Sequence, residues 1–245
     1  MMHSLLTHGF CGGRVRFPDF SSVIPHFDLG RRPLCLGSGS PIIFGMQRHY
    51  RLFAVALVLI IAVPAFSGEV VRLRVEDTIQ PASQQFIERA LAEAVDLDAD
   101  LVVMELDTPG GLVDTTRDIT TAITTSSVPV VVFVNPPGAR AASAGFFILL
   151  SADVAAMAPG TNTGAAHPVG GQGENLPEDV RDKVTNDAAA MVRSLAEQRG
   201  RNPVTAERTV IESISLTAEE ALEEGLIDLI ATDINDLLEQ LEGYE

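Results

Sequence analysis

The stretch "LVVMELDTPGG", residues 101–111, decides the fold. Its first six residues form a short and almost entirely apolar run, which is typical of a parallel strand buried on both faces. The "TPGG" that follows predicts a tight turn, and two adjacent glycines let a backbone approach a ligand closely. We therefore expect a parallel sheet with a functional loop at the carboxyl end of this strand. A turn without a function is the alternative interpretation of the glycines alone.

The same alternation continues on both sides of this stretch. Short apolar runs predict strands, and apolar residues at helical spacing predict helices. The predicted strands are 70–75, 101–106, 129–134, 154–157 and 226–230, and the predicted helices are 82–95, 113–125, 144–151, 177–199 and 217–224. A long glycine-rich loop is predicted over 159–176. The pattern indicates an α/β fold, with a mostly parallel sheet and flanking helices.

The N-terminal part of the chain differs from the rest. Residues 46–68 contain two arginines, an apolar run over 52–63 and small residues before Gly68. This order is typical of a signal peptide, which we expect to be cleaved after Ser67. The run is short for a membrane span, so a membrane anchor is the second interpretation. Either interpretation places the folded domain, residues 69–245, outside the cytoplasm.

Residues 1–45 show no periodic apolar face. We expect this segment to be disordered and to pack against nothing. It is either an extension upstream of a true start at Met46 or a cytoplasmic tail that precedes a signal anchor.

Residues 69–245 carry a strong negative charge. The chain has 17 basic and 33 acidic residues, of which the first 68 residues hold six and two. The remainder therefore has 11 basic and 31 acidic groups, a formal charge of −20. Such a surface repels nucleic acid, and we expect no DNA or RNA partner. Both cysteines, Cys11 and Cys35, precede this part, so we expect no disulfide, no thiol nucleophile, no metal and no other cofactor there.

A second candidate segment, "AASAG" at residues 141–145, follows the strand predicted at 129–134. A serine at the start of a helix lies in a positive field that favours its alkoxide, and the small neighbours of Ser143 leave room for a substrate. A serine nucleophile needs a base that takes its proton. Apart from carboxylates, residues 69–245 offer only His167 and Lys183. Packing among small residues is the alternative role for Ser143.

Five segments carry a family resemblance: "LDTPGGL", "AASAG", "GAAHPV", "KVTNDAAAMVRSLAEQRGRN" and "SLTAEEALEEGLID". Together they resemble the N-terminal protease domain of NfeD membrane-bound serine proteases, over about residues 70–241. The resemblance implies the ClpP/crotonase fold and a Ser–Lys dyad formed by Ser143 and Lys183. It also implies an oxyanion hole at Gly110 and Gly111.

The resemblance further implies an ATP-independent serine endopeptidase. Its substrates would be apolar peptide segments, including the C-terminus of a stomatin-like membrane partner. We also expect a homo-oligomer, a dimer or larger.

Lys183 is the only lysine of the chain, against 16 arginines. Arginine keeps its proton in proteins, whereas a desolvated lysine loses it more readily. A single retained lysine therefore suits a role that requires a neutral amine. We expect this amine to face Ser143 from the predicted helix 177–199, in apolar surroundings. A solvated lysine on the polar face of that helix is the alternative.

His167 is the rival base, 24 residues after Ser143. In cytosolic ClpP proteases, which this spacing resembles, an acid orients the histidine. The matching position here, three residues before Leu216, is Ser213. Serine does not stabilise an imidazolium as a buried carboxylate does. We therefore assign His167, together with Ala144, to substrate contact.

Two other functions stay open from the sequence. A crotonase-type acyl-CoA hydratase or isomerase shares the fold and the oxyanion hole. A signal peptide would separate such an enzyme from CoA, and an acidic surface suits CoA phosphates poorly. The second alternative is a catalytically inactive adaptor that binds apolar peptides in a protease-like groove.

Overall fold

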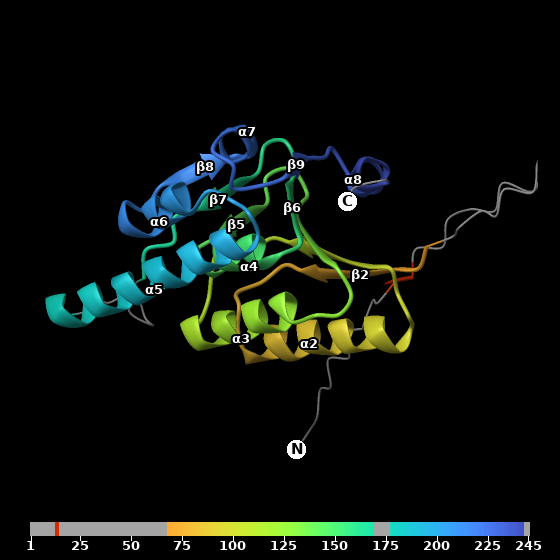
Figure 1. Cartoon of the computed structure of the whole chain (residues 1–245), viewed down its shortest axis with the longest axis horizontal. Helices are drawn as coiled ribbons and strands as arrows, with labels where there is room; N and C mark the ends of the chain where they lie inside the picture. Colours follow the sequence, from red (N-terminus) through yellow and green to blue (C-terminus); the bar gives the residue numbers. More distant parts are fainter. Residues whose placement is uncertain (1–12, 15–67, 169–176, 243–245) are drawn as a thin grey trace, which may run out of the picture. The chain divides into compact units, whose positions relative to one another are not determined.

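The computed structural model describes residues 13–14, 68–168 and 177–242 (Figure 1). In these ranges the main sheet has six strands in the order β1-β2-β3-β4-β6-β9. Every pairing is parallel except that of β1 with β2. The strands are β1 (Gly13–Arg14), β2 (Val70–Val75), β3 (Leu101–Leu106), β4 (Val130–Val134), β6 (Val154–Met157) and β9 (Leu229–Ile230). The predicted mostly parallel sheet is confirmed, with β3, β4 and β6 side by side.

Helices cover both faces of this sheet. The helices are α2 (Pro81–Asp96), α3 (Val113–Thr124), α4 (Ala144–Ser151), α5 (Glu178–Gln198), α6 (Pro203–Ile211), α7 (Ala218–Glu223) and α8 (Ile234–Leu241). Met104 and Leu106 of β3 pack into a large core with residues of α2, α3, α4 and α5. Val103 points the other way, into a smaller core that Leu237 and Leu238 of α8 complete. Side chains alternate along a strand, so one strand feeds both cores.

α4 lies at the centre of the larger core. All eight of its residues, "AGFFILLS", are buried. It packs between α3 and α5, which lie on either side of it in Figure 1. A helix that is apolar all round is stable only when it is enclosed in this way. The residue before α4 is Ser143, so the enclosed helix fixes the place of the candidate nucleophile.

A second, small sheet lies beside the start of α4. It consists of β5 (Arg140–Ala142), β7 (Asn162–Gly164) and β8 (Ser215–Thr217), in that order. β5 and β7 are parallel, and β7 and β8 are antiparallel. The sequence analysis missed all three strands and predicted a loop over the whole of 159–176. Strands of three residues show no period, because pairing with neighbours alone defines them. Residues 169–176 lie outside the described part of the chain.

The N-terminal expectations are only partly within reach of the structure. Gly13–Arg14 pairs with β2, so the expectation that residues 1–45 pack against nothing does not hold for these two residues. The other residues of 1–45, and the predicted signal segment up to Ser67, lie outside the described residues. Within the ranges that the structure describes, no helix has the length and apolar character needed to cross a membrane.

The segment after α5 holds the end of α4. Gly200 adopts a φ of 69°, which reverses the chain after the helix. Arg201 then points inward with only 2% of its side chain exposed. It donates to the carbonyl oxygens of Leu150 at 2.8 Å and Ala152 at 3.0 Å, and it forms an ion pair with Asp228. One side chain thus satisfies carbonyl groups at the end of α4, which the helix itself leaves unpaired.

We predict that Arg201→Met lowers the free energy of unfolding by about 3 kcal/mol or more, because it leaves the Asp228 carboxylate and buried carbonyls without a donor. Chemical denaturation with urea measures this change. Arg208→Met is the matched control, since Arg208 forms an exposed ion pair with Glu212 one turn away on the surface. The control is expected to unfold near the parent midpoint. A midpoint for Arg201→Met that equals that of the control contradicts this role for Arg201.

Candidate active site

The loop that follows β3 is bound to the strand that precedes Ser143. The Thr108 N–H donates to the carbonyl of Arg140 at 2.7 Å, and the Ala142 N–H donates to the carbonyl of Thr108 at 3.1 Å. Thr108 is fully buried, and its methyl group lies where a Cβ on Gly145 would be, at 2.6 Å. The loop, β5 and the first turn of α4 therefore form one tightly packed unit.

Gly110 brings this loop against the candidate nucleophile. Its φ is +128°, which an L side chain rarely adopts. A Cβ built on Gly110 would lie 2.8 Å from the Ser143 Cβ and 3.2 Å from its Oγ. The prediction that Gly110 and Ser143 meet at one end of the sheet is confirmed.

Ser143 occupies a strained turn between β5 and α4. Its φ of 51° and ψ of −113° are unusual for a residue with a side chain, and such conformations cost about 1–3 kcal/mol. The Ser143 N–H donates to the carbonyl of Gly164 at 2.9 Å, and its carbonyl accepts from the Phe146 N–H at 3.0 Å. A strained serine between a strand and a helix start resembles the nucleophile elbow of other hydrolases.

The backbone N–H groups around Ser143 differ in their hydrogen bonding. The Gly110 N–H donates to the Thr108 hydroxyl at 3.2 Å, a bond that the sequence did not lead us to expect. Among the described residues, the N–H groups of Gly111 and Ala144 have no hydrogen-bond acceptor. Both residues line the same pocket as Ser143. Two N–H groups that are free beside a nucleophile are suited to bind an oxyanion.

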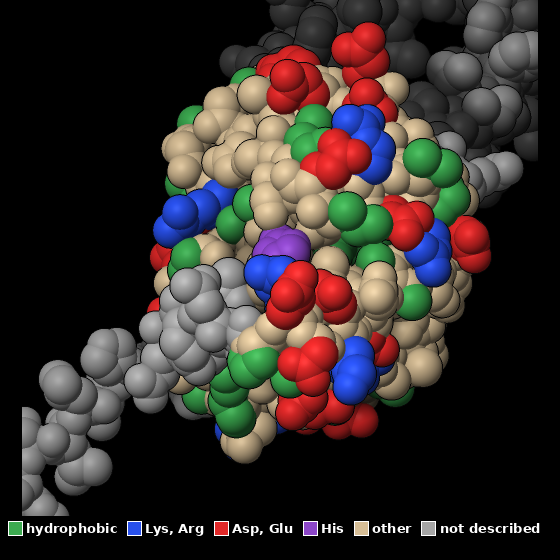
Figure 2. Space-filling model, turned by 90° about the vertical axis from the view of Figure 1, so that its left-hand side faces the viewer, with side chains coloured by type: hydrophobic (Ala, Val, Ile, Leu, Met, Phe, Trp, Pro, Cys, Tyr) green, Lys and Arg blue, Asp and Glu red, His purple; other side chains and the backbone are tan. Residues whose placement is uncertain are grey.

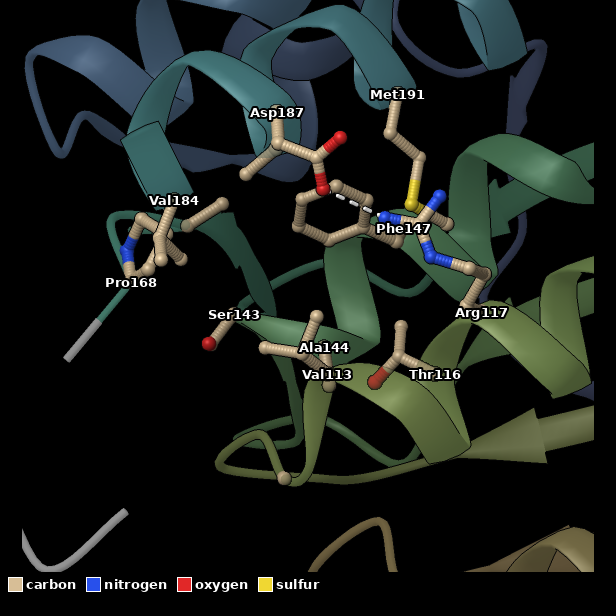
Figure 3. Close-up of a pocket in the computed structure, with 13 residues that line it drawn as sticks. Val113, Thr116, Arg117, Ser143, Ala144, Phe147, Pro168, Val184, Asp187 and Met191 are labelled. Atoms are coloured by element: carbon tan, nitrogen blue, oxygen red, sulfur yellow. Dashed lines mark hydrogen bonds and ion pairs between the residues drawn. The ribbon is translucent and has the colours of Figure 1, made fainter. Parts of the chain in front are cut away.

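An apolar pocket adjoins these groups (Figure 3). It encloses about 470 Å³, part of which is open to solvent. Its walls come from the start of α3, the start of α4, the segment after β7 and one face of α5. The apolar lining consists of Val113, Ala144, Phe147, Ala166, Pro168, Val184, Ala188 and Met191. Such a pocket is suited to an apolar side chain of a peptide.

Lys183 lies in the second turn of α5 and is exposed. Within the described part of the chain, it makes no hydrogen bond or ion pair, and it is not among the residues that line the pocket. Its neighbour Val184 does line the pocket, so Lys183 lies at the rim. The apolar surroundings that we expected for the amine are not present, because the first buried residue of α5 is Ala188.

His167 is half-buried and turned away from the pocket. Its Nδ1 lies 3.1 Å from the carbonyl oxygen of Val210 on α6. The residues on either side, Ala166 and Pro168, line the pocket, whereas His167 does not. Ser213 is exposed, and the structure records no hydrogen bond between it and His167 among the described residues. This geometry gives His167 a carbonyl partner in place of an orienting acid.

The surface of this part of the molecule is acidic. Figure 2 views the end at which α5 begins, and acidic side chains recur over the whole visible face. Glu178, Asp179 and Asp182 of α5 are all exposed. Among the residues that the structure describes, no three His, Cys, Asp or Glu side chains are grouped closely enough to hold a metal ion.

Two features of the site were missed by sequence reasoning. One is the free N–H group of Ala144, which was assigned only to substrate contact. The other is the pair Arg117 and Asp187, which lie 70 residues apart and meet at the pocket. The helical spacing of Lys183, Asp187 and Met191 was a signal for the second feature, because it places these residues on one side of α5.

Comparison with proteins of known sequence identifies relatives. Residues 69–239 match the family model described as the NfeD1b N-terminal domain. The chain is 37% identical over 196 residues to the membrane-bound protease PH1510 of Pyrococcus horikoshii. It is 33% identical over 184 residues to the membrane protein NfeD1b of Bacillus subtilis. These matches take in 79% and 70% of this chain, but only 44% and 40% of the two relatives.

Solved structures give the same result. Two are of 1510-N, described as a membrane-bound stomatin-specific protease. One is a serine-to-alanine mutant and the other a lysine-to-alanine mutant in complex with a substrate peptide. Their TM-scores are 0.66 and 0.67 at 38% identity, and the matches cover 71% of this chain and 84% and 80% of theirs.

A more distant structure supports the fold alone. ClpP1 from Listeria monocytogenes matches with a TM-score of 0.56 at 18% identity, over 68% of this chain and 94% of that chain. The expected ClpP-like α/β fold is therefore confirmed. From the family match over residues 69–239, we conclude that the chain belongs to the family of NfeD1b N-terminal domains.

Proposed function

We propose that the chain is a serine endopeptidase with Ser143 as nucleophile and Lys183 as base. The observation that carries the proposal is the place of Ser143, in a strained turn beside two free N–H groups and an apolar pocket. The relative 1510-N supports it, since that protease has been studied with a serine and a lysine each replaced by alanine.

The chemical steps follow from this arrangement. The Lys183 amine takes the proton of the Ser143 hydroxyl, and Oγ forms a bond to the peptide carbonyl carbon. The electron pair displaced onto the carbonyl oxygen is held by the N–H groups of Gly111 and Ala144. The C–N bond then breaks, and the leaving amine takes the proton back from Lys183. Water attacks the resulting ester by the same route and frees Ser143.

Gly110 has a different part in this mechanism from the one that the sequence indicated. Its N–H is bound to Thr108, whereas its left-handed backbone turns the chain so that Gly111 faces the pocket. We therefore propose Gly111 and Ala144 as the oxyanion donors and Gly110 as the residue that positions them.

Lys183 must move before it can act. A general base must come within about 3 Å of the proton that it takes, although sites without substrate are often looser. Lys183 has a long side chain at the pocket rim, beside Val184. A peptide bound in the pocket would cover this rim and exclude water, and desolvation favours the neutral form of an amine. The dyad is thus completed in the substrate complex.

The substrate class follows from the pocket and from the relative. The lining is predominantly apolar, so we propose an apolar peptide segment as substrate. Because 1510-N is described as specific for stomatin, we propose a stomatin-like membrane protein as the physiological partner. We further propose an extracytoplasmic location, with residues 46–68 as a signal peptide or anchor, and a homo-oligomeric state.

Three variants test the dyad in a peptidase assay on apolar peptides. Ser143→Ala is expected to lower kcat by at least about 1,000-fold, since it removes the nucleophile. Lys183→Arg is expected to lower kcat by about 100-fold or more, because arginine keeps its charge but does not accept a proton. His167→Ala is expected to lose less than about tenfold, as its ring bonds to a backbone carbonyl outside the pocket.

Other outcomes point to other functions. If Lys183→Arg retains near-parent activity while His167→Ala is inactive, the base is the histidine and the dyad is wrong. If the parent chain binds apolar peptides without cleaving them, and Ser143→Ala binds them equally well, the domain is an inactive adaptor.

A second prediction concerns the glycine that positions the oxyanion donors. Gly110→Ala is expected to lower kcat by about 100-fold, because displacement of a catalytic group by about 1 Å has an effect of that size. Its Cβ would contact Ser143 at 2.8 Å. Gly138→Ala is the matched control, since Gly138 also has a positive φ but no atom within 4 Å of the added Cβ.

The control is expected to lower the free energy of unfolding by about 1–2 kcal/mol through backbone strain alone. Its kcat is expected to remain within about threefold of the parent, because the strain lies away from the reacting groups. Equal kcat values for the two glycine variants would show that contact with Ser143 is not what matters.

A further inference from the structure

An ion pair crosses the apolar pocket. The Arg117 Nη2 of α3 donates to Asp187 Oδ2 of α5 at 2.7 Å, and both residues line the pocket. In Figure 3 the pair lies across the pocket from Ser143, beside Phe147. The two helices that carry it form opposite walls. The pair therefore closes the end of the pocket that is remote from the nucleophile.

A second groove begins on the other side of this pair. Arg117, Asp187 and Met191 line both spaces. The remaining lining of the groove is largely polar and comes from Thr120, Thr121 and Thr124 of α3 and from Ala190, Ser194 and Leu195 of α5. The ion pair is thus a partition between an apolar space beside Ser143 and a polar groove that continues between the same helices.

The pair contributes little to holding the fold together. The side chains of Arg117 and Asp187 are 47% and 66% exposed. Exposed ion pairs typically contribute no more than about 1 kcal/mol to stability. α3 and α5 are held in place independently by buried apolar residues such as Ile119, Ile123, Ala188 and Val192. Stability alone does not account for an ion pair at this position.

We propose that the Arg117–Asp187 pair determines the specificity of the peptidase, as the end wall of the pocket for a substrate side chain beside the scissile bond. This inference rests on the proposed peptidase function. The paired charges have no net charge, so the wall attracts neither an acidic nor a basic side chain. Any charged side chain that enters the apolar part also loses hydration. An uncharged side chain that ends before the partition is preferred.

The same geometry gives the effect of breaking the pair. Removal of the Arg117 charge leaves an unpaired carboxylate at the end of the pocket, which attracts a basic side chain. Removal of the Asp187 charge leaves an unpaired guanidinium, which attracts an acidic one. Removal of both charges opens the apolar pocket into the groove and favours longer apolar side chains. The three changes thus predict three different preferences.

The test uses the full chain and peptides that carry Leu, Phe, Lys or Glu beside the scissile bond, in one series before it and in another after it. For Arg117→Met, the ratio of kcat/KM for Lys over Leu is expected to rise by about tenfold. For Asp187→Asn, the ratio for Glu over Leu is expected to rise by about the same factor. For Arg117→Met/Asp187→Leu, the ratio for Phe over Leu is expected to rise, without a gain for Lys or Glu.

Matched controls separate specificity from general electrostatics. Arg193 of α5 and Glu207 of α6 form another exposed ion pair, away from both grooves. Arg193→Met and Glu207→Gln make the same changes in net charge as the single test variants. They are expected to leave all the ratios at parent values. Equal shifts in test and control variants would overturn the proposal, because the effect would then come from the overall field.

A binding measurement keeps this inference distinct from the proposed function. The same peptides are titrated by fluorescence anisotropy onto each variant combined with Ser143→Ala. If the parent cleaves peptides but no ratio changes in either measurement, the role of the ion pair is wrong and the peptidase function stands. If the binding ratios change as predicted while the parent cleaves nothing, the pocket assignment stands and the peptidase function is wrong.

Discussion

The site depends on the pairing of Thr108 with β5. Two backbone hydrogen bonds, from Thr108 to Arg140 and from Ala142 to Thr108, join segments that are more than 30 residues apart in the sequence. They place the glycine loop within contact of Ser143. Since Thr108 is fully buried and packs against Gly145, neither segment can shift alone. The N–H groups of Gly111 and Ala144 are thereby held in place before any substrate arrives, as electrostatic catalysis requires.

The sequence revealed the parts of the fold and site whose residue types are dictated locally. The apolar runs at β3, β4 and β6 had to be buried on both faces, and Gly110, Gly111 and Gly145 leave no room for a Cβ. It did not reveal β5, β7 and β8, which exist only through pairing, nor α6 and α8, whose apolar faces are short. Which N–H groups are free was also beyond sequence reasoning, because it depends on the hydrogen bond that Thr108 makes to Gly110.

The site has a rigid half and a loosely held half. Ser143 and the N–H groups belong to the buried unit around α4. Lys183 belongs to the first turns of α5, where every residue from Glu178 to Lys183 is exposed. Helix ends with few buried contacts open at low energy cost, whereas enclosed elements do not. The expectation of a buried amine followed from its chemical role, but a role in the substrate complex places no demand on the free chain.

α5 connects the proposed base with the proposed specificity wall. Val184, Asp187 and Met191 face the pocket from the same helix that carries Lys183. A side chain that fills the pocket therefore contacts α5 at three points within two turns of the base. Contacts that order these turns also restrict the amine, so occupation of the pocket and positioning of the base are coupled through one helix. In this arrangement a substrate with the wrong side chain loses binding and also fails to assemble the dyad, which is how induced fit raises specificity.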